Sequence, residues 1–418
     1  MKVIVLGAGL TGVTSAWYLA QAGHEVHVID RQPAAALEAS YANGGQISVS
    51  HPEPWANPGA PKQILRWLGR EDAPLKFRPR ADPRQWLWGL RFLFECLPGR
   101  SETNGRAIAA LGLYSRARLQ ALRRDTGLEY DCLQSGILHL FFDRPSIANV
   151  EGRARWLRGF GMQVEVLDPA GCAAVEPALA DCRDNLLGGL YAPQDESGDA
   201  HKFTQALAAL CAVRGVAFRH GTTIAGLVVD GGRVSGVRLN DAGGGVELLR
   251  GDAYVLSLGS YSALLAAEIG ENLPIYPVKG YSITLPLDAA KPAPRISITD
   301  ESRRIVCSRL GDRLRAAGTA ELAGYDSSIN ETRCRAIVQR VAELFPGLAE
   351  GAQPEFWAGL RPATPNNLPV IGRSRYSNLY FNTGHGTLGW TLACGSAAAL
   401  ADIVDGRRPE PVFPFRRL

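Results

Sequence analysis

The sequence lacks the residue spacings of a metal centre or a disulfide framework. Its eight cysteines lie far apart, with no C-x-x-C pair and no histidine at metal-ligand spacing: Cys96, Cys132, Cys172, Cys182, Cys211, Cys307, Cys334 and Cys394. Scattered cysteines of this kind are typical of reduced thiols in a cytosol-like compartment. We therefore expect buried free thiols and no bound metal.

A strong charge of either sign is also lacking. The 45 Lys and Arg residues and the 41 Asp and Glu residues leave a net charge of +4, and the basic residues are dispersed along the chain. A protein that binds nucleic acid usually gathers its basic residues in one patch or stripe. Nucleic acid is therefore not an expected partner.

Long apolar runs are absent as well. No stretch reaches the roughly 18 uncharged apolar residues that a helix needs to cross a bilayer. The first residues carry one lysine and a short apolar run that leads directly into glycines, which is not the layout of a signal peptide. These features predict a cytoplasmic protein.

The chain is long enough for more than one domain. It has 418 residues, of which 46% are hydrophobic and 21% charged, and this composition is typical of a globular protein. A single hydrophobic core rarely serves more than about 300 residues. We expect two domains, one of which can be inserted into the other.

A β–α–β pattern opens the chain. Residues 3–6 and 26–29 are apolar, β-branched runs that predict strands buried in a parallel sheet, and the apolar residues between them recur at helical spacing. Further along, a helix is predicted at 204–213, and short strands follow it. These strands are expected at 215–219, 224–229, 234–239 and 253–258, with a hairpin turn at 230–232.

Three glycines and an acid complete the opening pattern. In such a unit Gly7 permits a tight turn, Gly9 lets a pyrophosphate approach the backbone, and Gly12 allows the helix to pack closely on the strand. Asp30 follows the second strand, at the position of an acid that binds the adenosine ribose. The pattern predicts a dinucleotide site.

Two later segments favour FAD over NAD at this site. Residues 40–46, with the sequence SYANGGQ, are small and polar and can lie against a flat ring. Residues 382–390 contain three glycines and lead into an alanine-rich helix. The partial positive charge of a helix N-terminus favours the negative charge of a reduced flavin, and an NAD site has no such need.

Together these motifs resemble the FAD-dependent D-amino-acid oxidase superfamily. The resemblance is carried by the Gly7–Gly12 motif with Asp30 and Arg31, and by the segments 40–46, 359–365, 368–372 and 384–390. Within the superfamily, bacterial D-amino-acid dehydrogenase small subunits are most similar, with further likeness at 15–19 and 276–282. The resemblance covers nearly the whole chain.

An α/β fold with two domains is what the resemblance implies. The first is a discontinuous, Rossmann-like FAD-binding domain at 1–78, 190–272 and 356–418. The second is an α+β substrate domain with a mixed sheet at 79–189 and 273–355, giving a D-amino-acid oxidase-like fold.

The glycine motifs and the resemblance together predict the FAD contacts. They are Gly7, Gly9, Leu10, Thr11, Gly12, Asp30, Arg31, Ser40, Asn43, Gly44, Gly45, Gln46, Gly259, Arg361, His385, Gly386, Thr387, Leu388 and Gly389. A noncovalent flavin is expected, because neither Cys394, inside the last helix, nor His51 is well placed for a covalent bond.

An arginine should hold the substrate carboxylate, because a planar guanidinium matches a carboxylate through two hydrogen bonds. The resemblance places this anchor on a strand after the Lys-Gly stretch, which selects Arg309, with Arg315 as the alternative if the strand register differs by one position. Tyr276 and Tyr281 are candidate hydroxyl contacts or packing residues. His51 either lines the pocket or caps a turn.

The activity implied by the resemblance is oxidative deamination of D-amino acids to 2-oxo acids and ammonia. A hydride would pass from Cα to flavin N5, and the electrons would go on to a quinone-type acceptor. Alternatives are a D-hydroxyproline, glycine or sarcosine dehydrogenase or oxidase and, more distantly, a non-catalytic flavin-binding sensor or subunit. No motif separates an oxidase from a dehydrogenase.

Residues 84–97 are unusually rich in aromatic and apolar side chains. Aromatic residues at helical spacing most often form a helix packed in the core, here beneath the substrate domain. The second interpretation is an interfacial helix that makes peripheral contact with the inner face of the bacterial inner membrane.

Overall fold

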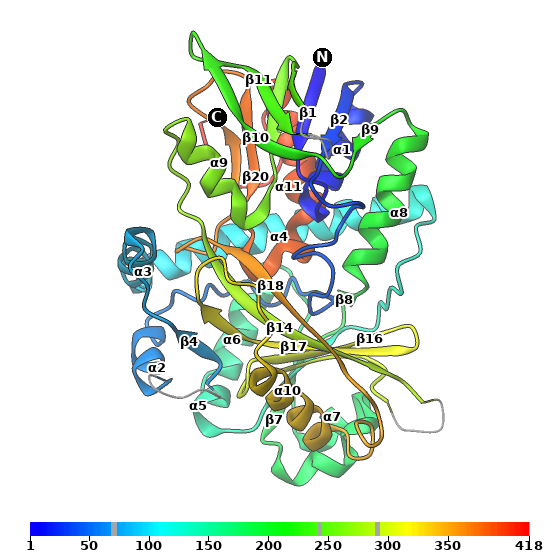
Figure 1. The fold of residues 1–418 in the computed structure, drawn as a ribbon. Helices are drawn as coiled ribbons and strands as arrows, with labels where there is room; N and C mark the ends of the chain where they lie inside the picture. Colours follow the sequence, from blue (N-terminus) through cyan, green and yellow to red (C-terminus); the bar gives the residue numbers. More distant parts are fainter. Residues whose placement is uncertain (68–72, 241–244, 289–292, 418) are drawn as a thin grey trace.

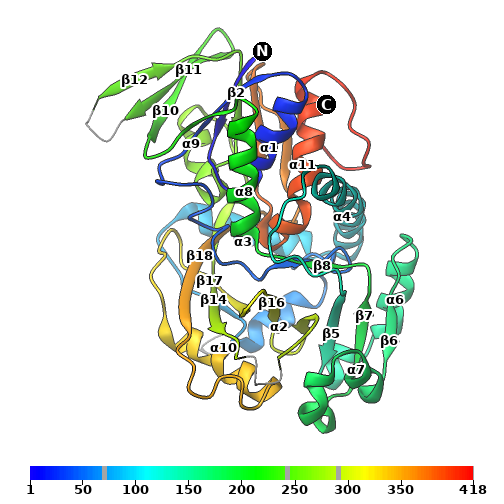
Figure 2. The same cartoon turned by 90° about the vertical axis from the view of Figure 1, so that its right-hand side faces the viewer.

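The computed structural model describes residues 1–67, 73–240, 245–288 and 293–417. Two sheets lie at opposite ends of the molecule, and both views in Figures 1 and 2 separate an upper layer that holds both termini from a lower layer built around β14–β17. This arrangement confirms the predicted α/β fold with mixed sheets.

The upper sheet has six strands in the order β19-β20-β13-β1-β2-β9, all parallel except for the edge pair β19–β20. The strands are β1 (Lys2–Leu6), β2 (Glu25–Ile29), β9 (Ala217–Arg219), β13 (Ala253–Leu256), β19 (Val370–Arg373) and β20 (Leu379–Thr383). The central strand is buried on both faces, because Val3 and Val5 enter one core and Ile4 and Leu6 enter another. A continuous apolar run is the sequence expected for such a strand.

Four helices cover one face of the upper sheet. Figure 2 shows α1 (Leu10–Gln21), α8 (Ala200–Val213) and α11 (Gly389–Val404) on this face, with α4 (Pro98–Thr126) beside α11. The segment Gly386–Val404 is long and apolar enough to cross a membrane, but 78% of its apolar window is buried inside the protein. It is the helix most enclosed by this core.

A small antiparallel sheet and a short helix cover the other face. The sheet consists of β10 (Thr223–Asp230), β11 (Arg233–Asn240) and β12 (Val246–Leu249), and the helix is α9 (Ser262–Glu268). The predicted strands and the hairpin turn between β10 and β11 are confirmed.

The lower sheet is mixed and has nine strands in the order β18-β14-β17-β16-β15-β5-β7-β6, with β4 paired to β17. The strands are β4 (Leu75–Phe77), β5 (Ile137–Phe141), β6 (Glu165–Leu167), β7 (Gly188–Ala192), β14 (Tyr276–Pro286), β15 (Ser297–Asp300), β16 (Ile305–Leu310), β17 (Arg313–Leu322) and β18 (Glu355–Ala363). Helix α10 (Glu331–Leu344) packs on the sheet face that points away from the upper layer.

The remaining elements connect these layers. They are β3 (Gln46–Ile47), β8 (Glu196–Ser197), α2 (Ala60–Trp67), α3 (Pro83–Glu95), α5 (Arg144–Ile147), α6 (Val150–Arg158), α7 (Pro169–Val175) and the 3-10 turns η1 (Pro177–Asn185), η2 (Gly259–Tyr261) and η3 (Gly386–Leu388). All eight cysteines are free, and all except Cys132 are buried, as expected.

Sheet membership does not follow the expected domain boundaries at every point. Strands β4 and β18 belong to the lower sheet, although their residues fall in segments that we assigned to the FAD-binding domain. Helix α4 packs with α11 in the upper layer, although we assigned it to the substrate domain. Chain segments cross between the layers more often than the resemblance implied.

Helix α3, which contains most of the aromatic segment, has one buried face and one exposed face. Trp88, Phe92 and Cys96 are buried in an apolar cluster against the lower sheet. The opposite face, which we call the α3 apolar face, is exposed and consists of Trp86, Leu87, Leu90, Leu93, Phe94 and Leu97.

Candidate functional site

A cavity of about 1670 Å³ lies between the two layers, and the predicted motifs line it. Of the predicted residues, those on its wall are Gly7, Gly9, Leu10, Thr11, Asp30, Arg31, Ser40, Asn43, Gly44, Gly45, Gln46, His51, Gly259, Tyr281, Arg361, His385, Gly386, Thr387, Leu388 and Gly389. Gly12, Tyr276, Arg309 and Arg315 are not part of this wall. The cavity exceeds the roughly 300–1,000 Å³ of an ordinary small-molecule site.

The glycine turn after β1 is shaped for a close approach of the backbone to a ligand. Gly7 has a φ of 107°, and a Cβ there would lie 2.6 Å from the Ser257 carbonyl oxygen. A Cβ at Gly12 would collide with the Gly7 carbonyl oxygen, so Gly12 permits helix packing instead of lining the cavity. No protein atom approaches a Cβ at Gly9 closer than 3.6 Å, which leaves its cavity side open.

Asp30 is fixed at the end of β2 beside this turn. Its Oδ2 accepts a hydrogen bond from the Ala8 amide at 2.6 Å, and its Oδ1 accepts one from the Gln32 amide at 2.8 Å. Burial raises the pKa of the Asp30 carboxyl, and these two amides act in the opposite direction. The side chain is therefore oriented at the cavity wall before any ribose arrives.

The loop 43–46 is held against the lower sheet. A Cβ at Gly44 would lie 2.5 Å from Cγ2 of Val306, and the Ser308 hydroxyl donates to the Gly44 carbonyl at 2.7 Å. The Gln46 side-chain amide donates to Thr299 Oγ1 at 3.0 Å. Only a small residue fits at position 44, so the backbone of this loop forms a flat part of the wall.

The loop before α11 closes the same cavity from the C-terminal end of the chain. His385 is buried, and its Nε2 lies 2.9 Å from Ser396 Oγ, whose hydrogen is donated to the Leu392 carbonyl at 2.5 Å. The ring hydrogen is therefore on Nε2, and burial lowers the pKa of His385 to about 3. His385 is a neutral residue that anchors the loop, and the N-terminus of α11 follows it at Gly389.

These features fit FAD. The open glycine turn with Asp30 suits the adenosine diphosphate part, because Gly7, Gly9 and Asp30 all line the cavity. The loop 43–46 and the N-terminus of α11 suit the ring, because both present backbone to the same space.

Neither arginine chosen from the sequence is available to a substrate. Arg309 lies on the same face of β16 as Ile305 and Cys307, which enter the core beneath the lower sheet, and its Nε donates to the Gly311 carbonyl at 3.1 Å. This placement does not fit the role of a carboxylate anchor. Arg315 does face the upper layer, but it donates to Thr284 Oγ1 at 2.8 Å and to the Asn43 carbonyl at 3.3 Å, so it supports the ring loop.

Arg361, which we predicted as an FAD contact, has the surroundings that a carboxylate anchor needs. It lies on β18 and lines the cavity, and its guanidinium covers Gly280, where a Cβ would collide with it. Its Nη1 donates to the Thr319 carbonyl at 3.0 Å, and within the described part of the chain no carboxylate pairs with it. Burial lowers the pKa of Arg361 to about 10. A partly desolvated cation without a counterion is unfavourable, and a bound anion offsets that cost.

The two candidate tyrosines do not present hydroxyls to the cavity. The Tyr281 hydroxyl donates to Glu321 Oε2 at 2.5 Å within the core beneath the lower sheet. Tyr276 packs with Trp88 in the apolar cluster under α3. Packing, which was the alternative for both residues, describes their placement.

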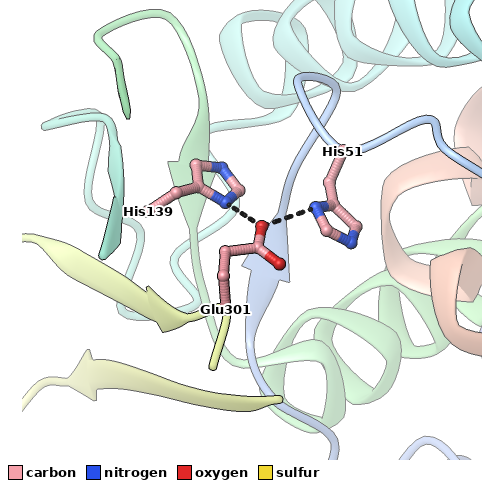
Figure 3. Close-up of side chains that lie close together, drawn as sticks. All are labelled: His51, His139 and Glu301. Atoms are coloured by element: carbon pink, nitrogen blue, oxygen red, sulfur yellow. Dashed lines mark hydrogen bonds and ion pairs between the residues drawn. The ribbon is translucent and has the colours of Figure 1, made fainter. Parts of the chain in front are cut away.

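His51 does line the cavity, where it joins a group of charged residues that the sequence did not reveal. We call this group the His51 cluster; it consists of His51, Glu53, His139, Arg153 and Glu301. Figure 3 shows both imidazoles directed at one carboxylate oxygen, with Glu301 Oε1 3.0 Å from His139 Nδ1 and 3.4 Å from His51 Nδ1. Apart from His51 and Glu53, which are two residues apart, the members come from distant segments, so no spacing in the sequence connects them.

The three side chains in Figure 3 have the composition of a metal site, with ligand atoms within 4.8 Å of one another. However, Arg153 Nη1 lies 2.8 Å from Glu301 Oε1, and Arg153 Nη2 lies 2.9 Å from His51 Nδ1. The guanidinium holds the place that a metal cation would take. The cluster is therefore an ion-pair network.

Comparison with known proteins gives the same assignment as the motifs. The model of the FAD-dependent oxidoreductase (DAO) family matches residues 2–403. The chain belongs to this family. Membership makes it an oxidoreductase and makes FAD its cofactor, as predicted.

Similar proteins share almost the full length of the chain. The D-amino acid dehydrogenase of Dechloromonas aromatica is 56% identical over 417 residues and covers 100% of both chains. The D-amino acid dehydrogenase of Paramagnetospirillum magneticum is 51% identical and covers 97% of this chain and 96% of its own. The crystal structure of glycine oxidase from Geobacillus kaustophilus, at 22% identity, has a TM-score of 0.77 over 100% of this chain and 98% of that one, which confirms the fold.

Proposed function

We propose that this protein is an FAD-dependent D-amino-acid dehydrogenase that converts D-amino acids into 2-oxo acids and ammonia. The observation that carries the proposal is Arg361, a half-buried arginine that faces the cavity without an acidic partner among the described residues. Support for the D-amino acid comes from the names of the relatives that are 56% and 51% identical.

In this function Arg361 binds the substrate carboxylate and fixes the orientation of Cα. A guanidinium holds a carboxylate through two parallel hydrogen bonds, which restricts rotation of the substrate. Because Thr319 already holds Nη1, the arginine does not have to be ordered when the substrate arrives. FAD, when bound, supplies the hydride acceptor for the Cα–H bond.

The walls of the cavity limit access of water around the substrate. Trp357 and Leu360, which share strand β18 with Arg361, line it, and large apolar side chains exclude water from the space they enclose. A drier site strengthens the interaction between Arg361 and a carboxylate. This part of the wall positions the substrate without taking part in the chemistry.

The test is an anaerobic titration of the purified flavoprotein. D-alanine, D-proline, cis-4-hydroxy-D-proline, glycine, sarcosine and the L-enantiomers are added separately while the flavin absorbance near 450 nm is followed. Reduction by D-amino acids and not by L-enantiomers is expected. Reduction by glycine or sarcosine alone would replace the proposal with a glycine-type oxidase, and no reduction by any of them would favour a flavin-binding protein without turnover.

We further propose that a quinone-type acceptor takes the electrons at a membrane surface that the α3 apolar face contacts. Leu90 is 67% exposed and Phe94 is 55% exposed, and they lie on one side of a helix whose other side is buried. Phe92 on that buried side lines the cavity, so the helix joins the exposed face to the interior of the site. An apolar stripe on a surface helix is typical of an interfacial membrane contact.

This second proposal has its own experiment. Vesicles of Escherichia coli polar lipids should co-sediment with the protein, and the double variant Leu90→Glu, Phe94→Glu should stay in the supernatant. Val412→Glu, at an exposed apolar residue far from α3 in the sequence, is the matched control and should sediment like the unaltered protein. Equal sedimentation of all three proteins would contradict the membrane contact.

A further inference from the structure

His51 is a member of the His51 cluster whose side chain reaches the cavity with one ring nitrogen unpaired among the described residues. Its side chain is 29% exposed and lines the wall, and Figure 3 shows Nε2 pointing away from Glu301. Among the residues that the structure describes, none forms a hydrogen bond with this nitrogen. The ring is also stacked on His139, with centroids 5.5 Å apart and planes 8° from parallel, which restricts its orientation.

Arg153 decides which nitrogen of His51 carries the hydrogen. Nδ1 of His51 lies 2.9 Å from Nη2 of Arg153, and a guanidinium can only donate. The contact of Nδ1 with Glu301 Oε1 is longer, at 3.4 Å, so the contact with Arg153 makes Nδ1 the acceptor and places the hydrogen on Nε2. A hydrogen on both nitrogens would place an N–H group against the guanidinium, so His51 faces the cavity as a donor and not as a base.

The charges around His51 balance one another. Glu301 Oε1 receives hydrogen bonds from His139 and Arg153, and its Oε2 pairs with Arg304 at 2.5 Å. Arg153 also pairs through Nε with Glu53 Oε1 at 2.7 Å. Two acids and two arginines leave no net charge. Beside these matched charges, His51 offers a ligand a neutral N–H donor.

His51 and Arg361 both lie beside one row of paired residues that runs across the strands β14, β17, β16 and β15 of the lower sheet. Tyr281 pairs with Gly318, Gly318 with Ile305, and Ile305 with Asp300. Gly280, beneath the Arg361 guanidinium, and Glu301, beside His51, are the next residues on the same side of this row. They are three strand spacings apart, about 14 Å. An amino acid with an extended side chain and a hydrogen bond of about 3 Å at each end can span much of this distance.

We propose that Nε2–H of His51 donates a hydrogen bond to an acceptor in the substrate side chain, so that the enzyme favours D-amino acids with a side-chain amide or hydroxyl over apolar ones of the same shape. The inference rests on the proposed function, because it assumes that Arg361 holds the carboxylate. Amides and hydroxyls fit this wall better than a second carboxylate, because a charged group would lose its hydration without gaining a counterion.

The test compares D-asparagine with D-leucine, which has the same branching and no acceptor. kcat/KM is measured for both with an artificial electron acceptor, in the holoenzyme and in two variants. His51→Asn keeps a side-chain oxygen that can accept from Arg153 but removes the donor at the position of Nε2. His51→Gln carries an amide N–H close to that position.

D-asparagine is expected to exceed D-leucine in the unaltered enzyme, and the ratio of their kcat/KM values should fall about 10-fold in His51→Asn. His51→Gln should restore most of the ratio. The same ratio in all three proteins would overturn the inference. So would an unaltered enzyme that favours D-leucine, a result that does not depend on the folding of any variant.

Failure of the proposed function gives a different result. If no D-amino acid, including D-alanine, reduces the flavin, the function itself is wrong.

A second measurement, made without substrate, tests which nitrogen of His51 carries the hydrogen. With ¹⁵N-labelled histidine, NMR should show the Nε2–H tautomer for the His51 ring and the other tautomer in no more than trace amounts. A ring with its hydrogen on Nδ1 would contradict the argument from Arg153.

Discussion

Arg361 and the His51 cluster are two polar regions of one cavity wall, and they treat charge in opposite ways. Arg361 keeps a half-buried positive charge that, among the described residues, donates one hydrogen bond, to the Thr319 carbonyl. In the His51 cluster, Glu301 binds Arg153, His139 and Arg304, so that each charge is matched inside the protein. A charge without a protein partner, such as that of Arg361, can bind an ionic group of a ligand. The His51 cluster, in which the charges are paired, can orient a ligand and form single hydrogen bonds with it.

The largest expected effect comes from removing the open charge. Arg361→Met should lower kcat/KM for D-alanine by about 10³-fold, because loss of one partner of a buried charge pair costs about 4 kcal/mol. Arg361→Lys should recover part of the loss, since it restores the charge without the bidentate geometry. Steady-state kinetics with an artificial acceptor measures both, and a loss below 10-fold in Arg361→Met would place the carboxylate elsewhere.

Removing the charge of Glu301 from the His51 cluster should lower the stability of the protein more than its activity. Glu301→Gln leaves Arg153 buried without its main partner and should lower the free energy of unfolding by about 3 kcal/mol. Glu53→Gln is the matched control, because Glu53 is 34% exposed and pairs with the same arginine. Urea unfolding of the holoenzyme gives both values, and equal losses would show that burial of Glu301 does not matter.

The network should also make stability depend on pH. Burial lowers the pKa of His139 to about 4, whereas the unfolded chain has the ordinary value of 6.5. As pH falls below 6.5, His139 binds a proton in the unfolded state but not in the folded state. Folding should therefore lose about 2 kcal/mol between pH 6.5 and pH 5. Unfolding curves across this range measure the slope, and His139→Gln should flatten it.

The smallest effect is expected at the arginine that lies on the other face of the sheet. Arg309→Ala should change kcat/KM for D-alanine less than 2-fold and stability by no more than about 0.5 kcal/mol, because its side chain is half-buried and bonded only to a nearby turn among the described residues. A 100-fold loss of activity would restore Arg309 as a candidate for the substrate site and would undermine Arg361.

The placement of the two arginines explains where interpretation of the sequence succeeded and failed. Residues 305–309 were correctly predicted to form a strand, but which side chains face the cavity depends on packing against α10. Ile305 and Cys307 enter that core, so Arg309 lies on their side and Ser308 and Arg315 lie on the other. Arg361 lies in the segment 359–365, and we predicted it as an FAD contact. No pattern in the sequence shows that it has no acidic partner among the described residues.

The strands β1 and β2, the glycine turn and the family could be predicted from the sequence, because they depend on local order: apolar runs, glycines at fixed spacing and an acid at the end of a strand. Tertiary structure alone decided the chemistry of the opposite wall. Glu53, His139, Arg153 and Glu301 come from four separate segments, and each charge is stable there only because the others surround it. No spacing pattern in the sequence reveals this cluster, because it forms only when the separate segments pack together in the folded protein.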